Sequence, residues 1–390
     1  MNIILSIALI SGLIWLYLIF FRGQFWQTNQ QLDLSSPSLT DFPLVCAIIP
    51  ARNEADVLPI SLPSLLQQNY PNLQVILIDD QSTDDTGKIA EDLAASLGKT
   101  SKLHLISGAD LPPGWSGKLW ALNQGVEFAH NLPQKPDYFL FTDADILHDP
   151  DNINHLINHS IKNNLDLVSL MVLLRCTSIW ERFLIPAFVF FFAKLYPFQW
   201  VNNHQNKTAA AAGGCILIKR DILTKIGGIE ILRQALIDDC TLAKYVKDSG
   251  GKIWLGLTKL NTSLRPYNSL STIWDMVART AFTQLNYSPF LLLGTVLAMS
   301  LVYLTAPFST IYGLIMLNLP IAIAGLFTWI LMSISYFPII KFYQISPLWV
   351  ITLPLISLFY TLMTIDSALR FYIGQGGKWK GRVYQLTMDN

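Results

Sequence analysis

An α/β domain with a mostly parallel sheet and helices on both faces, flanked by transmembrane helices at both ends, is the architecture that this sequence predicts. Two observations lead to it. Between residues 43 and 265, short apolar runs alternate with amphipathic stretches, which is the pattern of βα units around a parallel sheet. Outside that region lie long apolar segments, and the 390 residues are 52% hydrophobic but only 14% charged. A composition this apolar indicates a membrane protein with a soluble domain.

The N-terminal apolar segment predicts a transmembrane anchor in residues 1–22. Residues 2–21 carry no charge and are long enough to cross roughly 30 Å of hydrocarbon as a helix. A cleaved signal peptide would show a basic start and a cleavage site of small residues, and because both are missing we expect a retained anchor. Arg22 follows the segment, whereas no Lys or Arg precedes it, which favours a cytoplasmic catalytic domain. We therefore expect a multi-pass protein of the cell (inner) membrane.

The C-terminal apolar region, residues 289–373, predicts two or three further spans. An interfacial segment is expected before it, at residues 266–288, and a basic tail that contains the sequence GKWKGR is expected after it, at residues 374–390. Three spans would place this tail outside the cell, against the usual bias of basic residues towards the cytoplasmic side. One re-entrant or interfacial segment would resolve the conflict, so the number of spans stays open.

The central region predicts alternating strands and helices. The strand candidates are near-continuous apolar runs, as expected when helices cover both faces of a sheet. Amphipathic stretches between them are the helix candidates. Strands are expected at residues 44–50, 73–79, 102–107, 138–144, 166–174 and 214–219, and helices at residues 56–68, 84–97, 118–129, 150–162 and 238–248.

Three of these strands run into acidic or guanidinium side chains. The first leads into PARNE, the second into DDQSTDDT, and the fourth into DAD at residues 143–145. In open sheets of this kind, ligands bind at the carboxyl ends of the strands. An alternative for residues 82–86 is a helix N-terminus, in which Ser82 or Thr83 caps the backbone while Asp84 and Asp85 suit the helix dipole.

Asp143 and Asp145 together predict a divalent metal site. Burying a charge at a strand end is costly unless something compensates it. Two carboxylates one residue apart can hold a hard cation such as Mg²⁺ together with the oxygens of a diphosphate, and the cation would compensate the buried charge. It would also act as a Lewis acid on a departing phosphate. Two solvated loop acids are the alternative.

Several function classes lose support. The formal net charge of +0 argues against the basic surface that nucleic-acid binding requires. The four cysteines are scattered, without the spacing of a zinc site or a disulfide framework. Neither G-x-G-x-x-G after the first strand nor G-x-x-x-x-G-K-[ST] occurs, so dinucleotide oxidoreduction and P-loop chemistry lose their main support. A metal-bridged nucleotide diphosphate remains.

A series of motifs runs through the central region and just beyond it: PARNEADVLPISLPSLLQQNYP, DDQSTDDT, GWSGKLWALNQG, FTDADILHDP, AAGGCILIKRDILTKIGGI, IDDCTLAKYVKDSGGKIWLGL and MVARTAFTQLNYSP. In this order they resemble family 2 glycosyltransferases of the GT-A fold, and more narrowly the hopene-associated glycosyltransferases. The resemblance implies a Mg²⁺ or Mn²⁺ cofactor. It also implies inverting transfer of a sugar from a nucleotide-diphosphate sugar, expected to be a UDP-sugar, to a lipid acceptor related to hopanoids.

The resemblance also implies roles for individual residues in donor binding. Pro50, Arg52, Glu54 and Asp80 would hold the base and ribose, Asp79 would support their loop, Lys118 and Arg279 would meet the diphosphate, and Asp143 and Asp145 would be the metal-binding DxD pair, with Asp145 the direct ligand. Around Arg279 the sequence departs from the Gln-x-x-Arg-Trp pattern of processive members. That departure favours a single transfer over polymer synthesis.

The IDD motif supplies the catalytic acids. An inverting transfer needs a base that takes the proton of the acceptor hydroxyl as its oxygen attacks the anomeric carbon. The resemblance gives this role to Asp239 and the preceding acidic position to Asp238, although both lie at the start of a predicted helix, so capping is an alternative. Gly213 and Gly214 would let the backbone approach the acceptor or sugar.

Other features have plainer interpretations. His148 could approach the metal, but we expect it to be a surface loop residue, and we expect His155 and His159 to lie on a solvated helix face. Residues 180–200 are expected to be either an interfacial segment or a core helix. Two rival functions are a phosphatase of the haloacid dehalogenase type, which would use the DAD and IDD acids differently, and a non-catalytic membrane scaffold with a degenerate transferase domain.

Overall fold

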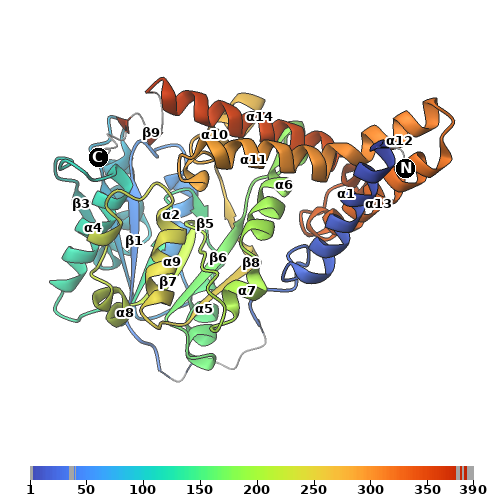
Figure 1. The fold of residues 1–390 in the computed structure, drawn as a ribbon. Coiled ribbons are helices and arrows are strands. Elements are labelled where there is room, and N and C mark those ends of the chain that lie inside the picture. The colour runs from blue at the N-terminus through green and yellow to red at the C-terminus, as the bar shows by residue number, and fades with distance from the viewer. Residues whose placement is uncertain (1–2, 35–38, 40, 375–377, 380–381, 384–390) are drawn as a thin grey trace. The chain divides into compact units, whose positions relative to one another are not determined.

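The computed structural model describes residues 3–34, 39, 41–374, 378–379 and 382–383 (Figure 1). The chain divides into two compact units. The first comprises Met1–Asn29, Cys176–Gln199 and Tyr267–Gly377, and the second comprises Gln30–Arg175, Trp200–Pro266 and Lys378–Asn390. The second unit contains most of the predicted α/β domain, and the first contains the apolar helices.

The α/β unit is built on an eight-stranded sheet of order β3-β2-β1-β4-β7-β6-β8-β5. The first four strands in this order run parallel, which confirms the mostly parallel pattern that the apolar runs predict. β7 is antiparallel to both of its neighbours, β6 and β8 are parallel, and β5 is antiparallel to β8, so the sheet as a whole is mixed. The strands are β1 (Val45–Ala51), β2 (Leu73–Asp79), β3 (Leu103–Ser107), β4 (Tyr138–Thr142), β5 (Ile146–Leu147), β6 (Leu167–Leu173), β7 (Cys215–Lys219) and β8 (Ile253–Ser263).

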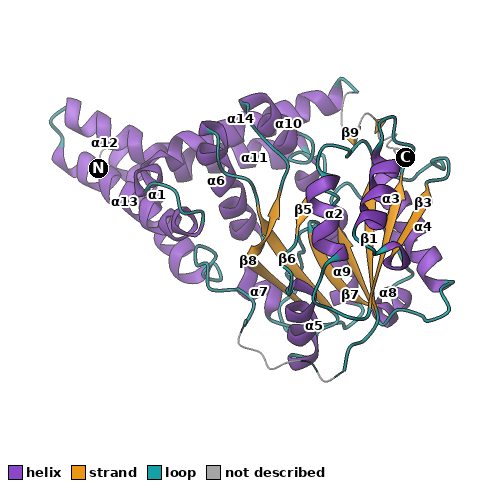
Figure 2. Ribbon diagram, turned by 180° about the vertical axis from the view of Figure 1, so that it is seen from behind, coloured by secondary structure: helices purple, strands orange, loops and turns teal. Residues whose placement is uncertain are grey.

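Helices pack along this sheet (Figure 2). All five predicted helices form, and the helix over residues 238–248 has the predicted bounds. Their packing brings the α4 backbone close to side chains of the sheet: a Cβ on Gly125 of α4 would lie 2.5 Å from Ile48 Cγ2 of β1 and 2.7 Å from Ile78 Cδ1 of β2. The helices of this unit are α2 (Leu58–Leu66), α3 (Thr86–Ser96), η1 (Thr100–Lys102), α4 (Gly117–His130), α5 (Asn152–Lys162), α7 (Phe198–Asn202), α8 (Arg220–Lys225), η2 (Glu230–Leu232) and α9 (Asp238–Asp248).

Two strands of the sheet were not predicted, β5 and the eleven-residue β8. The β8 sequence interrupts its apolar residues with Gly256 and Lys259, so it lacks the continuous run that marks the other strands. Its place in the sheet depends on parallel pairing with β6, in which Leu167 pairs with Ile253, 86 positions later in the chain. A single-segment pattern contains no signal of that pairing.

Within the described residues, four helices are long and apolar enough to cross a membrane. One is α1 (Ile3–Phe21), and three lie in the C-terminal region at Pro289–Ile315, Leu319–Phe342 and Pro347–Tyr372. Length and composition therefore give the larger of the two span numbers predicted for that region. These segments contain α11 (Pro289–Met299), the π-helical turn η4 (Ser300–Leu304), α12 (Thr305–Ile315), α13 (Leu319–Phe342), η5 (Pro347–Thr352) and α14 (Leu353–Tyr372).

The helical unit also contains α6 (Ile179–Leu195), α10 (Leu270–Ala278) and η3 (Thr283–Leu285). Residues 180–200 are mostly helical: α6 begins with a capping box in which Ser178 and Glu181 exchange side-chain-to-backbone hydrogen bonds. Side chains such as Phe190 are buried, and α6 contacts α13 and α14. The helix α6 therefore packs against two candidate membrane spans, and both alternatives for residues 180–200 stay predictions.

Most of the predicted basic tail, including Lys380, lies outside the described residues. Two short strands, β9 (Lys378–Trp379) and β10 (Arg382–Val383), are described there as an antiparallel pair. The described part of the tail therefore contains a short antiparallel strand pair.

Candidate active site

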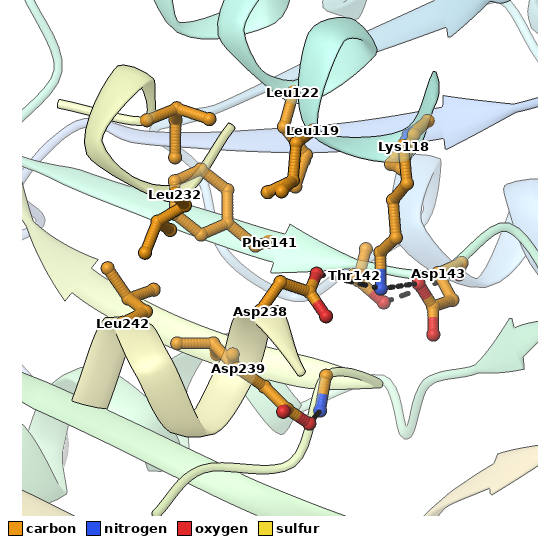
Figure 3. A pocket seen from close by; sticks show the side chains of 14 residues that line it. Lys118, Leu119, Leu122, Phe141, Thr142, Asp143, Leu232, Asp238, Asp239 and Leu242 are labelled. Atoms are coloured by element: carbon orange, nitrogen blue, oxygen red, sulfur yellow. Dashed lines mark hydrogen bonds and ion pairs between the residues drawn. The ribbon is translucent and has the colours of Figure 1, made fainter. Parts of the chain in front are cut away.

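The candidate site is a solvent-open pocket at the carboxyl ends of β1 and β4 (Figure 3). Charged residues line one part of it and apolar residues line the rest. Its lining consists of Pro50, Lys118, Leu119, Leu122, Phe141, Thr142, Asp143, Gly213, Ile216, Ile229, Leu232, Asp238, Asp239 and Leu242. The structure thus brings together six of the predicted site residues from five separate segments.

Lys118 lies at the centre of the charged part. It is the second residue of α4, whose N-cap Ser116 accepts a hydrogen bond from Leu119 N, and this cap fixes the start of the helix. Lys118 Nζ lies 2.9 Å from Asp143 Oδ1 and 3.6 Å from Asp238 Oδ2, between the two carboxylates (Figure 3). Burial alone would lower the pKa of Lys118, but the nearby carboxylates raise that pKa above its usual range. The lysine is therefore a cation at neutral pH.

Asp239 is held by two backbone donors. Gly213 N donates to Asp239 Oδ2 at 2.9 Å, and Cys240 N donates to Oδ1 at 2.7 Å. Burial and the charge of Asp238 raise the pKa of Asp239 to about 6, although Lys118 and the two N–H groups act in the opposite direction. A carboxylate with a pKa in this range is suited to accept a proton near neutral pH.

The capping alternative for Asp239 describes one of its two contacts, because Oδ1 accepts from Cys240 N in the first turn of α9. The N-cap of α9 is Ile237, which makes no side-chain cap hydrogen bond, and Asp238 and Asp239 are the first two residues of the helix. The other oxygen, Oδ2, accepts from Gly213 N, and Asp239 is one of the residues that line the pocket (Figure 3). The start of α9 therefore presents two acids to the pocket.

Protein groups lie close to Gly213 and Gly214. A Cβ on Gly213 would lie 3.3 Å from Lys118 Nζ and 3.5 Å from Asp239 Oδ2, and one on Gly214 would lie 3.0 Å from Val172 Cγ2. The backbone at Gly213, which was expected to approach the acceptor or sugar, lies close to Lys118 and Asp239 of the same site.

Asp145 has different partners from Asp143. Its side chain is buried and lies outside the pocket lining, where Asp145 Oδ2 accepts a hydrogen bond from Ser263 Oγ at 2.8 Å. Arg265 Nε lies 3.4 Å from the same oxygen, and Arg265 Nη2 lies 3.0 Å from Glu54 Oε1. Arg265 was not predicted as a site residue, because it follows β8, which was itself missed.

The donor chemistry of the DxD pair fits a hard cation. No group of three or more His, Cys, Asp and Glu side chains that could hold a metal occurs among the described residues. Two carboxylates suffice for Mg²⁺ when substrate phosphates and water complete the sphere, so a metal here depends on the donor. Without the donor, Lys118 and Arg265 supply the positive charge beside Asp143 and Asp145.

The predicted base-and-ribose residues lie in two loops that hold each other. Arg52 Nη1 donates to Gln81 O at 3.0 Å and lies 3.9 Å from the buried Asp80 Oδ2. Glu54 N donates to Thr86 Oγ1 at 2.9 Å. Of the predicted donor residues in these loops, Pro50 is the one that also lines the pocket.

The helix-start alternative for residues 82–86 is correct in type but wrong in detail. Ser82 Oγ accepts a hydrogen bond from Asn53 N, and the N-cap of α3 is Asp85, whose side chain makes no cap bond. Asp84 Oδ1 accepts from Thr86 N at 3.1 Å, so Asp84 satisfies the helix start. Asp79 Oδ1 accepts from Ser82 N at 3.0 Å and so supports the loop, as expected.

His148 is not the surface residue that its loop position predicts. Its side chain is 3% exposed, and burial lowers its pKa to about 3. A solvated helix face is also wrong for His159, whose ring packs on Trp254 with the ring centres 4.3 Å apart. The apolar residues 146 and 147, which precede His148, are a sequence signal of burial. A polar residue after an apolar run is equally typical of the exposed end of a strand.

Arg279 belongs to the other unit, where it follows α10 and its N–H donates to Asp275 O. Its predicted contact with the diphosphate stays a prediction.

The comparisons with known proteins agree with this architecture. The Glycosyl transferase family 2 domain matches residues 46–227. A protein of Haemophilus influenzae named as an uncharacterized glycosyltransferase is 30% identical over 125 residues, which is 32% of this chain and 45% of that protein. The 4,4'-diaponeurosporenoate glycosyltransferase of Staphylococcus haemolyticus is 33% identical over 102 residues, 26% of this chain and 24% of that protein. The chain therefore spans less than half the length of these relatives.

One solved structure resembles nearly the whole chain. The mannosyltransferase PcManGT of Pyrobaculum calidifontis, in complex with GDP-Man and Mn²⁺, superimposes with a TM-score of 0.59 over 94% of this chain and 99% of its own, at 18% identity. At that identity the likeness establishes the fold, which is of the GT-A type. The fold and the acidic strand ends agree with the family match, in which residues 46–227 are similar to the Glycosyl transferase family 2 domain.

Proposed function

We propose that this protein is a membrane-bound inverting glycosyltransferase that moves a sugar from a nucleotide-diphosphate sugar, expected to be a UDP-sugar, to a lipid acceptor. The observation that carries the proposal is the meeting of Lys118 and Asp143, from the segment matched by the family 2 domain, with Asp238 and Asp239 in one pocket. A cation and a carboxylate base, both at the carboxyl edge of the sheet, are the two groups that displacement of a diphosphate requires.

Asp239 is the base in this proposal. The acceptor hydroxyl oxygen attacks the anomeric carbon and forms the new glycosidic bond, and its proton passes to Asp239. The bond between that carbon and the diphosphate oxygen breaks, the electron pair leaves with the diphosphate, and the configuration inverts. Gly213 N and Cys240 N hold the carboxylate in one orientation before the acceptor arrives.

Lys118 stabilises the negative charge that grows on the diphosphate. Its ammonium group has a carboxylate partner, Asp143, at 2.9 Å, and phosphate oxygens are acceptors of the same charge type. The loops that contain Pro50, Arg52 and Asp79 lie at the ends of β1 and β2, so they supply the base and ribose contacts in this proposal.

Asp143 and Asp145 are the residues that would hold Mg²⁺ or Mn²⁺. When bound, the metal would neutralise charge on the diphosphate and so favour its departure. The GT-A neighbour is a complex with GDP-Man and Mn²⁺, which makes a nucleotide-diphosphate sugar with a divalent metal the first combination to test.

The acceptor is proposed to be a membrane lipid related to hopanoids. Four apolar helices in the same chain support an acceptor that resides in the bilayer, and the motif series supports the hopanoid class. The name of the Staphylococcus haemolyticus relative gives 4,4'-diaponeurosporenoate as the compound on which that protein acts.

A donor screen tests the proposal. The full chain in nanodiscs is incubated with labelled UDP- and GDP-sugars, a total lipid extract and Mg²⁺ or Mn²⁺, and the labelled lipid is counted. We expect one donor to give labelled lipid, and the label to be absent when EDTA is added. Release of inorganic phosphate from phosphate esters in place of sugar transfer would support the phosphatase alternative. Binding of a nucleotide without turnover of any donor would support the scaffold alternative.

A further inference from the structure

A chain of buried hydrogen bonds runs from β8 to the pocket wall, where it ends at Thr142 and the turn that contains Gly213. Its members are Thr142, His148, Asn152 and Asn261, whose exposed fractions are 2%, 3%, 0% and 0%. They come from β4, from the segment after β5, from α5 and from β8. Polar groups buried this deeply are almost always hydrogen-bonded. Because each group has a fixed number of donors and acceptors, the direction of each bond can be worked out.

The first end of the chain is fixed by a backbone donor. Asp149 N can only donate, and it does so to Asn261 Oδ1 at 3.3 Å. This contact orients the amide, so Asn261 Nδ2 donates to Asn152 Oδ1 at 2.9 Å. Asn152 Nδ2 therefore donates to His148 Nδ1 at 3.1 Å, and that ring nitrogen carries no proton.

The second end is fixed by a backbone acceptor. Gly214 O can only accept, so the single hydroxyl proton of Thr142 is donated to it, at 2.9 Å. Thr142 Oγ1 has then no proton left for His148, and His148 Nε2, 2.9 Å away, must be the donor. Both ends thus require the same neutral tautomer, with the proton on Nε2.

This chain of hydrogen bonds, which we call the relay, ends next to the residues that hold Lys118 and Asp239. Thr142 is followed by Asp143, the partner of Lys118, and Gly214 is preceded by Gly213, whose N–H holds Asp239 Oδ2. We propose that His148 is a positioning residue which, through Thr142, fixes the Gly213 turn and so the orientation of the base Asp239. The inference rests on the proposed function and adds a residue to it. The low pKa of His148 that burial causes agrees with a neutral ring, because an added proton on Nδ1 would face the Asn152 amide protons.

Kinetics of variants along the relay test the inference. Thr142→Val removes the hydroxyl at nearly constant shape, and His148→Leu removes both ring contacts. We expect each to lower kcat about ten- to hundredfold with the donor KM within about twofold, because displacement of a positioned group by an ångström can cost this much. The double variant should have about the same kcat as the less active of the two single variants, since both substitutions break the same hydrogen bond. Thr142→Ser, and in part His148→Gln, should restore kcat.

The pH profile separates positioning from mere stability. Asp239 faces Asp238, Lys118, Gly213 N and Cys240 N, and loss of an aligned Gly213 N–H should move the acid limb of kcat to higher pH. Ser160→Ala is the control. Ser160 lies on the same helix as Asn152, outside the pocket lining, and its Oγ donates a buried hydrogen bond to Leu165 O. It should lower the melting temperature and leave kcat and its acid limb unchanged.

Two results would overturn the inference. In the first, Thr142→Val and His148→Leu lower the melting temperature as Ser160→Ala does, but keep the kcat and the acid limb of the wild type. The hydrogen bonds would then contribute to stability alone. The other comes from ¹⁵N-histidine NMR of the full chain in nanodiscs, where an Nδ1–H tautomer or an imidazolium at His148 near pH 7 would contradict the bond directions. This measurement needs no turnover, so it decides the inference even if the donor screen fails, a failure that would count against the proposed function instead.

Discussion

Asp239 is the residue that we propose as the catalytic base. Two N–H groups orient its carboxylate, and its raised pKa keeps proton affinity near neutral pH. We expect Asp239→Asn to lower kcat by about 10²- to 10⁴-fold, the usual contribution of general acid–base catalysis, with little change in donor affinity. Asp248→Asn, an exposed acid at the other end of α9, is the control. Turnover close to wild type in Asp239→Asn would remove the base from the proposal.

Lys118 and Asp239 are coupled by charge, which gives a pH prediction. Asp239 must be deprotonated to act, so kcat should fall as the pH drops through about 6. The ammonium of Lys118 lowers the pKa of Asp239, so Lys118→Met should raise that pKa and move the acid limb to higher pH. The donor KM should rise as well. Lys88→Met, on the exposed side of α3, is the control, and an unchanged acid limb in Lys118→Met would contradict the coupling.

Arg265 pairs with two acids. It contacts Glu54 and Asp145, both buried, while its own side chain is 35% exposed. Arg265→Leu should therefore destabilise the protein by about 1–3 kcal/mol, less than a fully buried pair because water screens the arginine. Mn²⁺ should raise the melting temperature more in this variant than in wild type if Asp145 is a metal ligand. Equal Mn²⁺ shifts in the two proteins would remove Asp145 from the metal site.

The helix α4 places Lys118 by close packing on the sheet. A Cβ at Gly125 would meet Ile48 and Ile78 within 2.7 Å, and strands β1 and β2 leave α4 little room to move. Gly125→Ala should cost about 1–3 kcal/mol of stability, as overpacking does, and should raise the donor KM by shifting Lys118. Gly294→Ala is a matched control, because a Cβ there meets nothing within 4 Å. A variant as stable as wild type would show that the helix can shift without cost.

Strand β8 shows what an element contributes beyond its own sequence. It supplies Asn261 to the relay and Ser263 to Asp145, and the chain leaves it towards Arg265. All three contacts were missed because the strand was missed. The helices over residues 84–97 and 238–248 were predicted, since their apolar spacing and acidic starts are local, and so were the acidic ends of β1, β2 and β4.

The number of membrane crossings decides where the C-terminal tail lies. Three helices of the C-terminal region are long and apolar enough to cross. If all three crossed, a cytoplasmic catalytic domain would place the GKWKGR tail outside, against the charge bias. We expect two to cross and the tail to be cytoplasmic. A GFP and an alkaline phosphatase fused in turn after Asn390 test this, because GFP should fluoresce and the phosphatase should be inactive; the opposite pattern would show three crossings.

The sequence alone determined the apolar ends, the α/β core between them and the acidic residues at the strand ends, because hydrophobic periodicity and short motifs are local properties. It also suggested that a metal compensates the buried carboxylates. Only the tertiary structure showed that Lys118 lies against Asp143 and Arg265 against Asp145, and that His148 is buried. The physical reason is that a buried polar group is defined by its partners: Arg265 is 120 positions from Asp145, and folding alone brings such groups within hydrogen-bonding distance.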